Sequence, residues 1–399
     1  MNEVTIHDHV VIPISGGRKL SARMWQPKSD VPLPVIVESH PYPHAYATAT
    51  RDEINHGYFA AHGYVALRVD TPGSGDSDGQ MSDQYQAEEH AAVLEVLDWV
   101  RAQPWCDGSL GMFGHSWGAY SSLQVAALQP EGLKAIVFSG ASDNLYTEDC
   151  NYCGGVQTTE NMGWASTLLS FLTRPPTSAG FGPERTKKWV ERLEKLEWIL
   201  PTWLSNAART DYWHQGSVCD DYSRVQVPVL MASGWADTYP SAVLRMAEHL
   251  PGTFVGVLGP WAHKFPHMGM PGPAIGWLQE AVAWWDRWLK GADNGADKQP
   301  RLRAFIEEDT RPDPMPDGVR AGRWVAEAAW PPAHPLSRSF FLKDQSLTGE
   351  AGTGQVTIAS PADTGLDAGE LMPMAWGADL PGDQRGDDGK SVCFDSAVL

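Results

Sequence analysis

The feature that most constrains this sequence is a Gly-x-Ser-x-Gly motif at residues 114–118, between an apolar run at 110–113 and a segment of helical character. In that setting the motif predicts a sharp strand-to-helix turn that lifts the Ser116 hydroxyl above a sheet. Gly114 and Gly118 suit such a turn because a side chain there would collide with neighbouring backbone. A serine hydroxyl is a weak nucleophile at neutral pH, so the turn predicts a histidine and a carboxylate elsewhere.

Short apolar runs alternate with helical patterns on both sides of this motif. A hairpin is predicted first, with Gly16 and Gly17 supplying the positive φ of its turn. The alternation that follows favours right-handed crossovers and a mostly parallel sheet. The expected strands are 4–14, 20–26, 35–39, 64–70, 110–113, 135–138, 227–233 and 254–258, and the expected helices are 51–62, 85–101, 116–128, 240–250 and 276–290.

The alternation stops between 140 and 222, where scattered tryptophans and an amphipathic helix at 184–200 predict a helical cap inserted into the sheet domain. The sheet domain is therefore expected to comprise 1–139 and 223–295. Beyond 295, short strand candidates at 302–306, 323–325 and 339–342 lie between turn-rich segments, so 296–399 is expected to begin an all-β domain.

Two further loops complete a catalytic site. The strand at 227–233 runs into Asp237, and the strand at 254–258 runs into His263. Alone, Asp237 could be a helix cap and His263 a solvated loop histidine. The chain order Ser116, Asp237, His263, each after its own strand, instead matches an α/β-hydrolase triad. His263 would then take the Ser116 proton, and Asp237 would orient the imidazole.

The developing oxyanion needs hydrogen-bond donors. One is the backbone N–H of Trp117, directly after the nucleophile. The second should come from the loop after the strand at 35–39, but Pro41 and Pro43 have no N–H. The hydroxyl of Tyr42, between these prolines, is the expected substitute.

The net charge limits the classes of binding partner that we expect for this chain. The chain of 399 residues has a formal net charge of −19, which disfavours nucleic acids and anionic membranes. No apolar run is long enough to span a bilayer, and the first residues do not resemble a signal peptide. Five cysteines, an odd and sparse set, suit a reduced cytoplasmic protein better than a disulfide framework. No cofactor or metal is expected. The sequence leaves open whether the chain forms a homo-oligomer.

The combination of motifs resembles the X-Pro dipeptidyl-peptidase/cocaine esterase family of serine acyl hydrolases. The matching stretches are 41–42, 70–79, 105–118, 234–237, 259–263 and, at the link into a β-domain, 383–396. The resemblance implies an α/β-hydrolase core with a helical cap and a C-terminal jelly roll, and a tyrosine hydroxyl in the oxyanion hole. The chain departs from the family in having Trp117 where tyrosine is common, and in ending among the early strands of the expected jelly roll, which therefore looks incomplete.

Within that family, substrates include esters, β-lactam acyl groups and peptides with a penultimate proline. The cap stretch at 146–155 is similar to an acidic stretch of amino-acid ester hydrolases, so Glu148 and Asp149 could hold a substrate ammonium, or could belong to a solvated acidic loop. Trp164 is expected to shape an apolar acyl pocket. Because the chain starts directly at the first hairpin, a hydrolase of small esters or amides is favoured over removal of Xaa-Pro dipeptides. A catalytically silent binding module is a further alternative.

Overall fold

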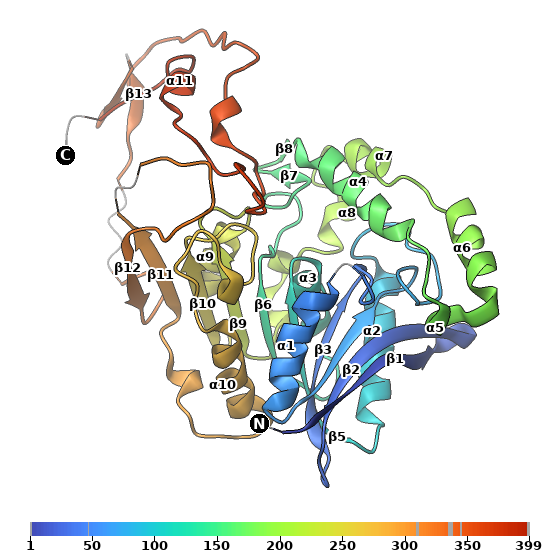
Figure 1. Ribbon diagram of the computed structural model, residues 1–399. Coiled ribbons are helices and arrows are strands. Elements are labelled where there is room, and N and C mark those ends of the chain that lie inside the picture. Colours follow the sequence, from blue (N-terminus) through green and yellow to red (C-terminus); the bar gives the residue numbers. More distant parts are fainter. Residues whose placement is uncertain (1, 47, 309–310, 334–337, 344, 397–399) are drawn as a thin grey trace.

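The computed structural model describes residues 2–46, 48–308, 311–333, 338–343 and 345–396. Within them, ten strands form one central sheet in the order β1-β2-β4-β3-β5-β6-β9-β10-β11-β12 (Figure 1). The strands from β4 to β11 in this order are parallel, and β1, β2 and β12 are antiparallel to their neighbours. Their bounds are β1 Val4–Ile14, β2 Arg18–Pro27, β3 Leu33–His40, β4 Val65–Asp70, β5 Cys106–His115, β6 Leu133–Ser139, β9 Val229–Gly234, β10 Phe254–Gly259, β11 Leu302–Glu307 and β12 Gly322–Glu327.

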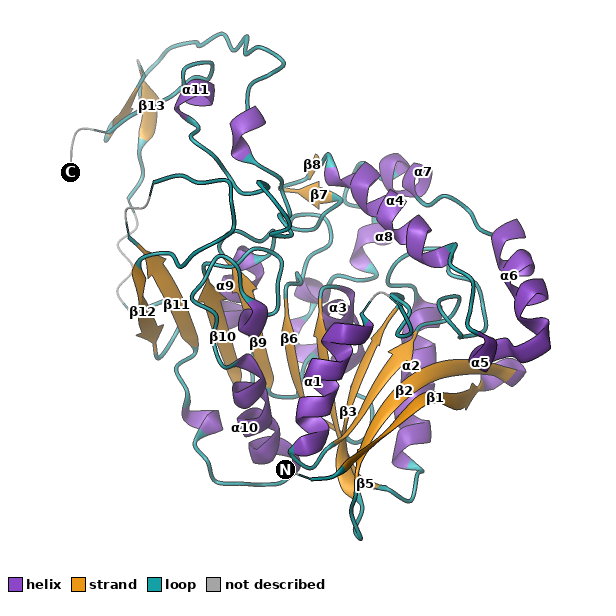
Figure 2. Cartoon of the chain, viewed as in Figure 1, coloured by secondary structure: helices purple, strands orange, loops and turns teal. Residues whose placement is uncertain are grey.

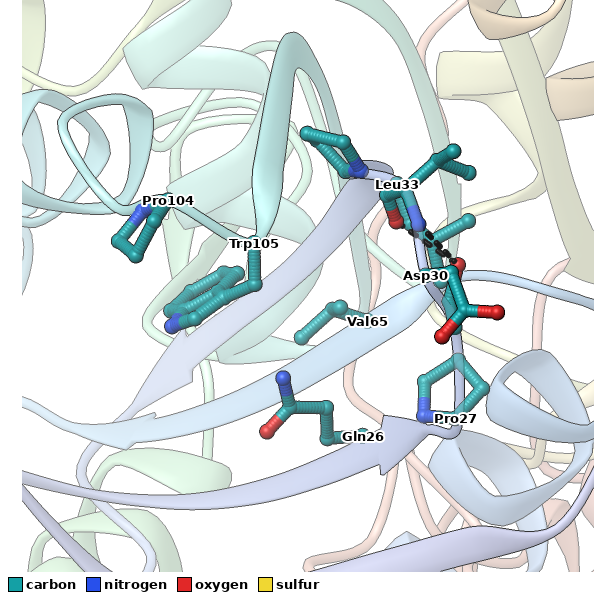
Figure 3. Close-up of a pocket in the computed structure, with 10 residues that line it drawn as sticks. Gln26, Pro27, Asp30, Leu33, Val65, Pro104 and Trp105 are labelled. Atoms are coloured by element: carbon teal, nitrogen blue, oxygen red, sulfur yellow. Dashed lines mark hydrogen bonds between the residues drawn. The ribbon is translucent and has the colours of Figure 1, made fainter.

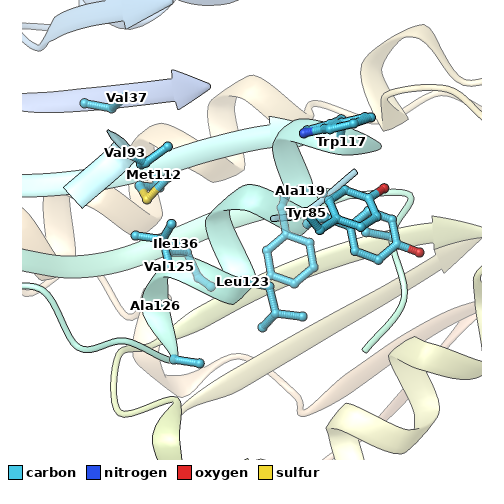
Figure 4. Close-up of a cluster of buried hydrophobic side chains, with 14 of the residues drawn as sticks. Val37, Tyr85, Val93, Met112, Trp117, Ala119, Leu123, Val125, Ala126 and Ile136 are labelled. Atoms are coloured by element: carbon cyan, nitrogen blue, oxygen red, sulfur yellow. The ribbon is translucent and has the colours of Figure 1, made fainter. Parts of the chain in front are cut away.

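Helices cover both faces of this sheet (Figure 1). The helices α1 Ala49–Ala61 and α10 Trp277–Leu289 lie on one face, where Phe59 and Trp285 join a buried aromatic cluster. The helices α2 Ala87–Arg101, α3 Trp117–Ala126 and α9 Pro240–His249 bury the other face. Figure 4 shows part of that second core, in which Val37, Met112 and Ile136 from the strands meet side chains of α2 and α3. The expected α/β-hydrolase sheet is therefore confirmed.

The segment between β6 and β9, where the sequence predicts a cap, consists of helices and a small hairpin beyond one end of the sheet (Figure 2). The helix predicted at 184–200 ends at Glu194 in the structure. Pro201 explains the break, because proline suits only the first turn of a helix, and a new helix starts at Leu200. The elements are β7 Tyr152–Cys153, β8 Val156–Gln157, α4 Glu160–Leu172, α5 Ser178–Phe181, α6 Arg185–Glu194, α7 Leu200–Ser205 and α8 Asp211–His214.

The strands after residue 295 differ from the expectation. Those expected at 302–306 and 323–325 to open a separate β-domain are β11 and β12, and they extend the central sheet. The physical reason is that the edge of β10 offers unpaired N–H and C=O groups, which β11 satisfies. After β12 the structure has a hairpin, β13 Phe341–Lys343 and β14 Ser346–Thr348, and a short helix, α11 Arg385–Asp388. A jelly roll stays a prediction.

Seven short 3₁₀ segments complete the described secondary structure: η1 Ser15–Gly17, η2 Gly182–Glu184, η3 Val218–Asp220, η4 Tyr222–Arg224, η5 Pro266–Met268, η6 Ala296–Lys298 and η7 Leu366–Ala368. Among the helices of the described ranges, none has both the length and the apolar character needed to cross a membrane.

Candidate active site

Ser116 occupies the turn between β5 and α3 in a strained backbone conformation. Its φ of 57° and ψ of −121° are rarely adopted by a residue with a side chain. The turn is closed tightly, since a Cβ on Gly114 would lie 2.1 Å from the carbonyl carbon of Gly118. Strain of this kind gathers at functional sites, where the surrounding structure holds it in place. The turn therefore has the geometry that the motif predicts.

Asp237 and His263 meet in space although 26 residues separate them. Asp237 follows β9 and His263 follows β10, and these two strands are parallel neighbours, so both loops leave the same end of the sheet. The Nδ1 atom of His263 lies 3.0 Å from Oδ1 and 3.1 Å from Oδ2 of Asp237. Both side chains are almost fully buried. A buried carboxylate at Nδ1 fixes the imidazole tautomer and leaves Nε2 free to accept a proton.

A cavity of about 640 Å³ contains both Ser116 and His263. Its walls come from the sheet loops, from α4 of the cap and from the segment after residue 369. Most of the lining surface is apolar, as in sites that bind small molecules, with charged side chains such as Arg51 and Lys264 between the apolar ones. Trp164 belongs to this lining, as expected from the sequence. The apolar and aromatic members are Tyr42, Trp164, Phe171, Phe265, Met268, Met372, Met374 and Trp376.

The two expected oxyanion donors flank Ser116. Tyr42 is buried and lines the same cavity as Ser116, and burial raises the pKa of its hydroxyl, so it stays protonated at neutral pH. Trp117 is the first residue of α3, where backbone N–H groups point out of the helix. Its indole Nε1 donates to Glu89 at 2.6 Å, which fixes the side chain beside the turn.

The cap carboxylates expected to hold an ammonium lie elsewhere. Glu148 accepts from the guanidinium of Arg245, and Asp149 accepts from the hydroxyls of Tyr120 and Tyr239 at 2.9 and 3.0 Å. Both carboxylates are buried, and neither is among the residues that line the cavity. The structure therefore does not bring them to Ser116, and they are not solvated either, because neighbouring donors bind them.

Two other carboxylates, which the sequence reasoning missed, do line the cavity. Glu160 comes from α4 and Glu370 from the C-terminal segment. Burial and the nearby Glu370 charge both raise the pKa of Glu160. In the described part of the chain neither carboxylate has a salt-bridge partner within 4 Å. No motif marks them, because they become neighbours only when the chain folds.

His115, which precedes the nucleophile, was also missed. Its Nδ1 lies 2.9 Å from the Ser139 hydroxyl, and its ring centroid lies 4.4 Å from that of His263. Burial, and secondly the nearby His263, lowers its pKa well below the usual range, so the ring is neutral. The sequence could have indicated His115, because it lies inside the Gly-x-Ser-x-Gly motif, directly before Ser116.

One group of side chains has donors suited to a metal ion. Ligand atoms of Glu38, Asp52 and His56 lie within 4.8 Å of one another. The guanidiniums of Arg51 and Arg68, however, already form ion pairs with these carboxylates. A divalent cation would have to compete with two fixed positive charges at close range, so the donor set fits a metal poorly.

A second hollow, of about 260 Å³, lies near the starts of β3 and β4, at the end of the sheet opposite Ser116. Figure 3 shows Gln26, Asp30 and Trp105 around it. It contains neither a histidine nor a nucleophile beside a base, so the site at residue 116 is the candidate for catalysis.

Comparisons with known proteins show which family and which folds this chain is similar to. The family model described as X-Pro dipeptidyl-peptidase (S15 family) matches residues 16–265. The cocaine esterase of Rhodococcus sp. (strain MB1 Bresler) is 26% identical over 99% of this chain and 75% of its own length.

Two solved structures have a similar fold. A CocE/NonD family hydrolase from Staphylococcus aureus has a TM-score of 0.66 at 16% identity, covering 87% of this chain and 60% of its own. An α-amino acid ester hydrolase has a TM-score of 0.67 at 18% identity, covering 98% and 71%. The chain thus spans about 60% of the first structure's length. Since the family model matches more than half of the sequence, the chain belongs to the X-Pro dipeptidyl-peptidase (S15) family.

Proposed function

We propose that this hydrolase cleaves carboxylic ester or amide bonds through an acyl-enzyme formed on Ser116. His263 Nε2 takes the hydroxyl proton as Ser116 attacks the carbonyl carbon, and then donates it to the leaving group. Asp237 holds Nδ1 and stabilises the imidazolium that forms. The N–H of Trp117 and the O–H of Tyr42 stabilise the oxyanion. Water then repeats the sequence and releases the acid.

One observation carries this proposal: the His263–Asp237 pair opens into the same cavity as a serine held in a strained strand-to-helix turn. A histidine whose tautomer is fixed by a buried carboxylate is useful as a base only where a proton donor faces it. The Tyr42 hydroxyl, protonated at neutral pH and in the lining of the same cavity as Ser116, further supports an oxyanion hole at this point.

Hydrolysis of p-nitrophenyl esters by the full chain tests the proposal. We expect Ser116→Ala to abolish turnover and to leave the thermal unfolding temperature within a few degrees of the wild type, because only a hydroxyl is lost. Ser166→Ala, on the exposed side of α4, is the matched control and should retain full activity. Turnover that persists in Ser116→Ala would refute the assignment.

We favour esters over Xaa-Pro peptides because the cocaine esterase relative is matched over 99% of this chain. The family also includes dipeptidyl-peptidases, so the choice needs a direct comparison. Rates on a p-nitrophenyl ester and on a Xaa-Pro p-nitroanilide, measured with one preparation, decide it. A higher kcat/KM on the anilide would reassign the chain as a peptidase with the same machinery.

A second candidate is a hydrolase selective for acyl groups that carry an amine. The observation that favours it is the presence of Glu160 and Glu370, without salt-bridge partners in the described chain, in the wall of the cavity. Glu160→Gln and Glu370→Gln should then raise KM for an amino-acid ester and leave KM for a neutral ester of the same size unchanged. Glu194→Gln, on the outer cap, is the matched control. Equal effects on both esters would count against an ammonium site.

A further inference from the structure

The loop that carries Tyr42 is held by a buried network of charged side chains in addition to two backbone hydrogen bonds, from Tyr46 to the carbonyl of Pro43 at 3.0 Å and from Thr71 to that of His40 at 3.4 Å. Pro41 and Pro43 cannot donate. The N–H of Tyr42 reaches only the Nδ1 of His40, at 3.3 Å, and the N–H of His44 reaches Asp70 at 2.9 Å. The position of the Tyr42 hydroxyl therefore depends on the side chains beneath the loop.

The register of two strands places this network under the turn. The strands β3 and β4 are parallel, with Glu38 opposite Arg68 and His40 opposite Asp70. All four side chains are completely or almost completely buried. The network also touches the nucleophile turn, since a Cβ on Gly118 would lie 3.2 Å from Glu38 and 3.4 Å from His40.

Arg68 is the centre of the network. Its Nη2 donates to the carbonyl oxygen of Tyr42 and, at 2.7 Å, to the Nδ1 of His40. Its charge is balanced by Asp52 and Asp70, each at 3.4 Å. One planar guanidinium thus donates hydrogen bonds to the Tyr42 carbonyl and to the adjacent imidazole, a geometry that the single ammonium of lysine cannot reproduce.

Arg51 lies at the other side of the same imidazole and is joined to Arg68 through Asp52, which both guanidiniums contact. Its Nη2 lies 2.9 Å from the Nε2 of His40, 3.0 Å from Asp52 and 3.4 Å from Glu38. Burial, with the two arginine charges, lowers the pKa of His40 well below the usual range. The ring is therefore neutral and has one acceptor nitrogen: Nδ1 accepts the Arg68 hydrogen bond and Nε2 carries the proton, so Arg51 is held by Asp52 and Glu38 and not by the ring. The centroids of the His40 and Tyr42 rings are 4.8 Å apart, so the ring of His40 also supports the Tyr42 ring.

We propose that Arg68, supported by Arg51, is a positioning residue that holds the Tyr42 hydroxyl at the oxyanion of the reacting substrate. This inference rests on the proposed role of Tyr42. Arg68 does not line the cavity and acts through the carbonyl of Tyr42 and the ring of His40, whereas Arg51 lines the cavity and acts on Arg68 through Asp52. A small displacement of a catalytic donor is enough to lower the rate strongly.

A double-mutant cycle with a p-nitrophenyl ester tests the inference. Arg68→Lys should lower kcat roughly tenfold or more, with KM changed less than about twofold, because the loss falls on the transition state. In a Tyr42→Phe background the same substitution should lower kcat less than about twofold, because the hydroxyl that Arg68 positions is already absent.

Arg23→Lys is the matched control. Arg23 lies directly opposite Arg68 in the register of β2 and β4, but its partners are Asp8 and Glu53, at 2.9 and 2.8 Å. Its kcat should equal that of the parent in both backgrounds. Thermal unfolding of every variant reports the state of the fold, and if Arg68→Lys does not fold, the cycle is completed with the partly exposed Arg51→Lys, for which we expect the same dependence on Tyr42.

The outcomes separate this inference from the function on which it rests. An equal fold-change in kcat with and without the Tyr42 hydroxyl, or an unchanged kcat in Arg68→Lys, would overturn the positioning role and leave the oxyanion hole intact. An unchanged kcat in Tyr42→Phe alone would instead remove Tyr42 from the oxyanion hole, and the inference with it.

Discussion

The two prolines that flank Tyr42 explain why a side chain, rather than a backbone amide, faces Ser116. They remove the donors that a loop after the third strand would otherwise offer, and the tyrosine hydroxyl lies in their place. We predict that Tyr42→Phe lowers kcat on a p-nitrophenyl ester roughly ten- to thousandfold, the cost of one oxyanion donor. The ring is kept, so the unfolding temperature should change little. Steady-state kinetics at saturating ester measure the effect, and an unchanged kcat would mean that other donors form the hole.

Glu89, which binds the indole of Trp117, should make stability depend on pH. Burial raises its pKa from 4.5 to about 7. The folded protein therefore holds a proton that the unfolded chain releases, so the contribution of Glu89 is full below pH 4.5 and is lost as pH rises through 7. The loss is about 3 kcal/mol. Glu89→Gln cannot ionise, so urea unfolding should show it gaining about that much over the wild type between pH 4.5 and 8. A difference that stays constant with pH would contradict the prediction.

At the scale of single residues, the sequence could indicate those that follow a strand or lie inside a motif. Asp237 and His263 were found in this way, and the structure places them in contact. Glu160 and Glu370 could not be found, because they lie 210 residues apart and no local pattern links them. The sequence could have indicated Arg68, because it is a charged residue among the apolar residues of β4, but its partners depend on strand register.

At the scale of elements, the approach of β5 to α3 depends on Gly114. A Cβ there would lie 2.1 to 2.6 Å from backbone atoms of Gly118 and Ala119, which have no room to move. We predict that Gly114→Ala lowers the free energy of unfolding by at least about 3 kcal/mol and displaces the nucleophile. Gly57→Ala, in α1, is the contrasting control: nothing lies within 4 Å of its Cβ, so stability should rise by about 0.5–1 kcal/mol. Urea unfolding measures both, and a neutral Gly114→Ala would show that the turn is looser than described.

At this scale, the sequence could not predict which strands pair with each other. Periodicity located the strands and helices of the sheet domain because each has its own apolar pattern. It could not show which sheet a short strand joins, and so β11 and β12 were predicted to belong to a separate domain. In the structure β11 pairs with β10, and β12 pairs with β11. Pairing is decided by the free edge of β10, which is not a property of residues 302–327.

At the scale of the whole molecule, the cavity exists only because three separate parts of the chain meet around Ser116. The sheet loops supply Ser116 and His263, the proposed reacting groups, α4 supplies Trp164 and Phe171, and the C-terminal segment supplies Met372 and Met374. That segment is attached to the catalytic loops, since the N–H of His263 donates to Pro373 at 2.9 Å. The cap and the C-terminal segment should therefore set the size of the acyl group that is accepted.

Trp164→Ala tests this division of roles. The ring lies at right angles to that of Tyr42, with centroids 6.3 Å apart, in the wall of the cavity. We predict that KM for a bulky aromatic ester changes at least about fivefold while kcat/KM for an acetyl ester changes less than about twofold, because only the large acyl group reaches the wall. Trp198→Ala, on the exposed part of the cap, should change neither. Equal effects on both esters would remove Trp164 from the acyl pocket.

The most direct test of the account is covalent labelling of the intact protein with a fluorophosphonate, followed by mass spectrometry of its peptides. We predict one label, on Ser116, that is abolished in Ser116→Ala and slowed at least about a thousandfold in His263→Ala, with His249→Ala, on the exposed end of α9, labelling at the wild-type rate. A folded wild-type protein that takes no label, or takes it on another serine, would show that residues 116, 237 and 263 do not form a working hydrolytic site.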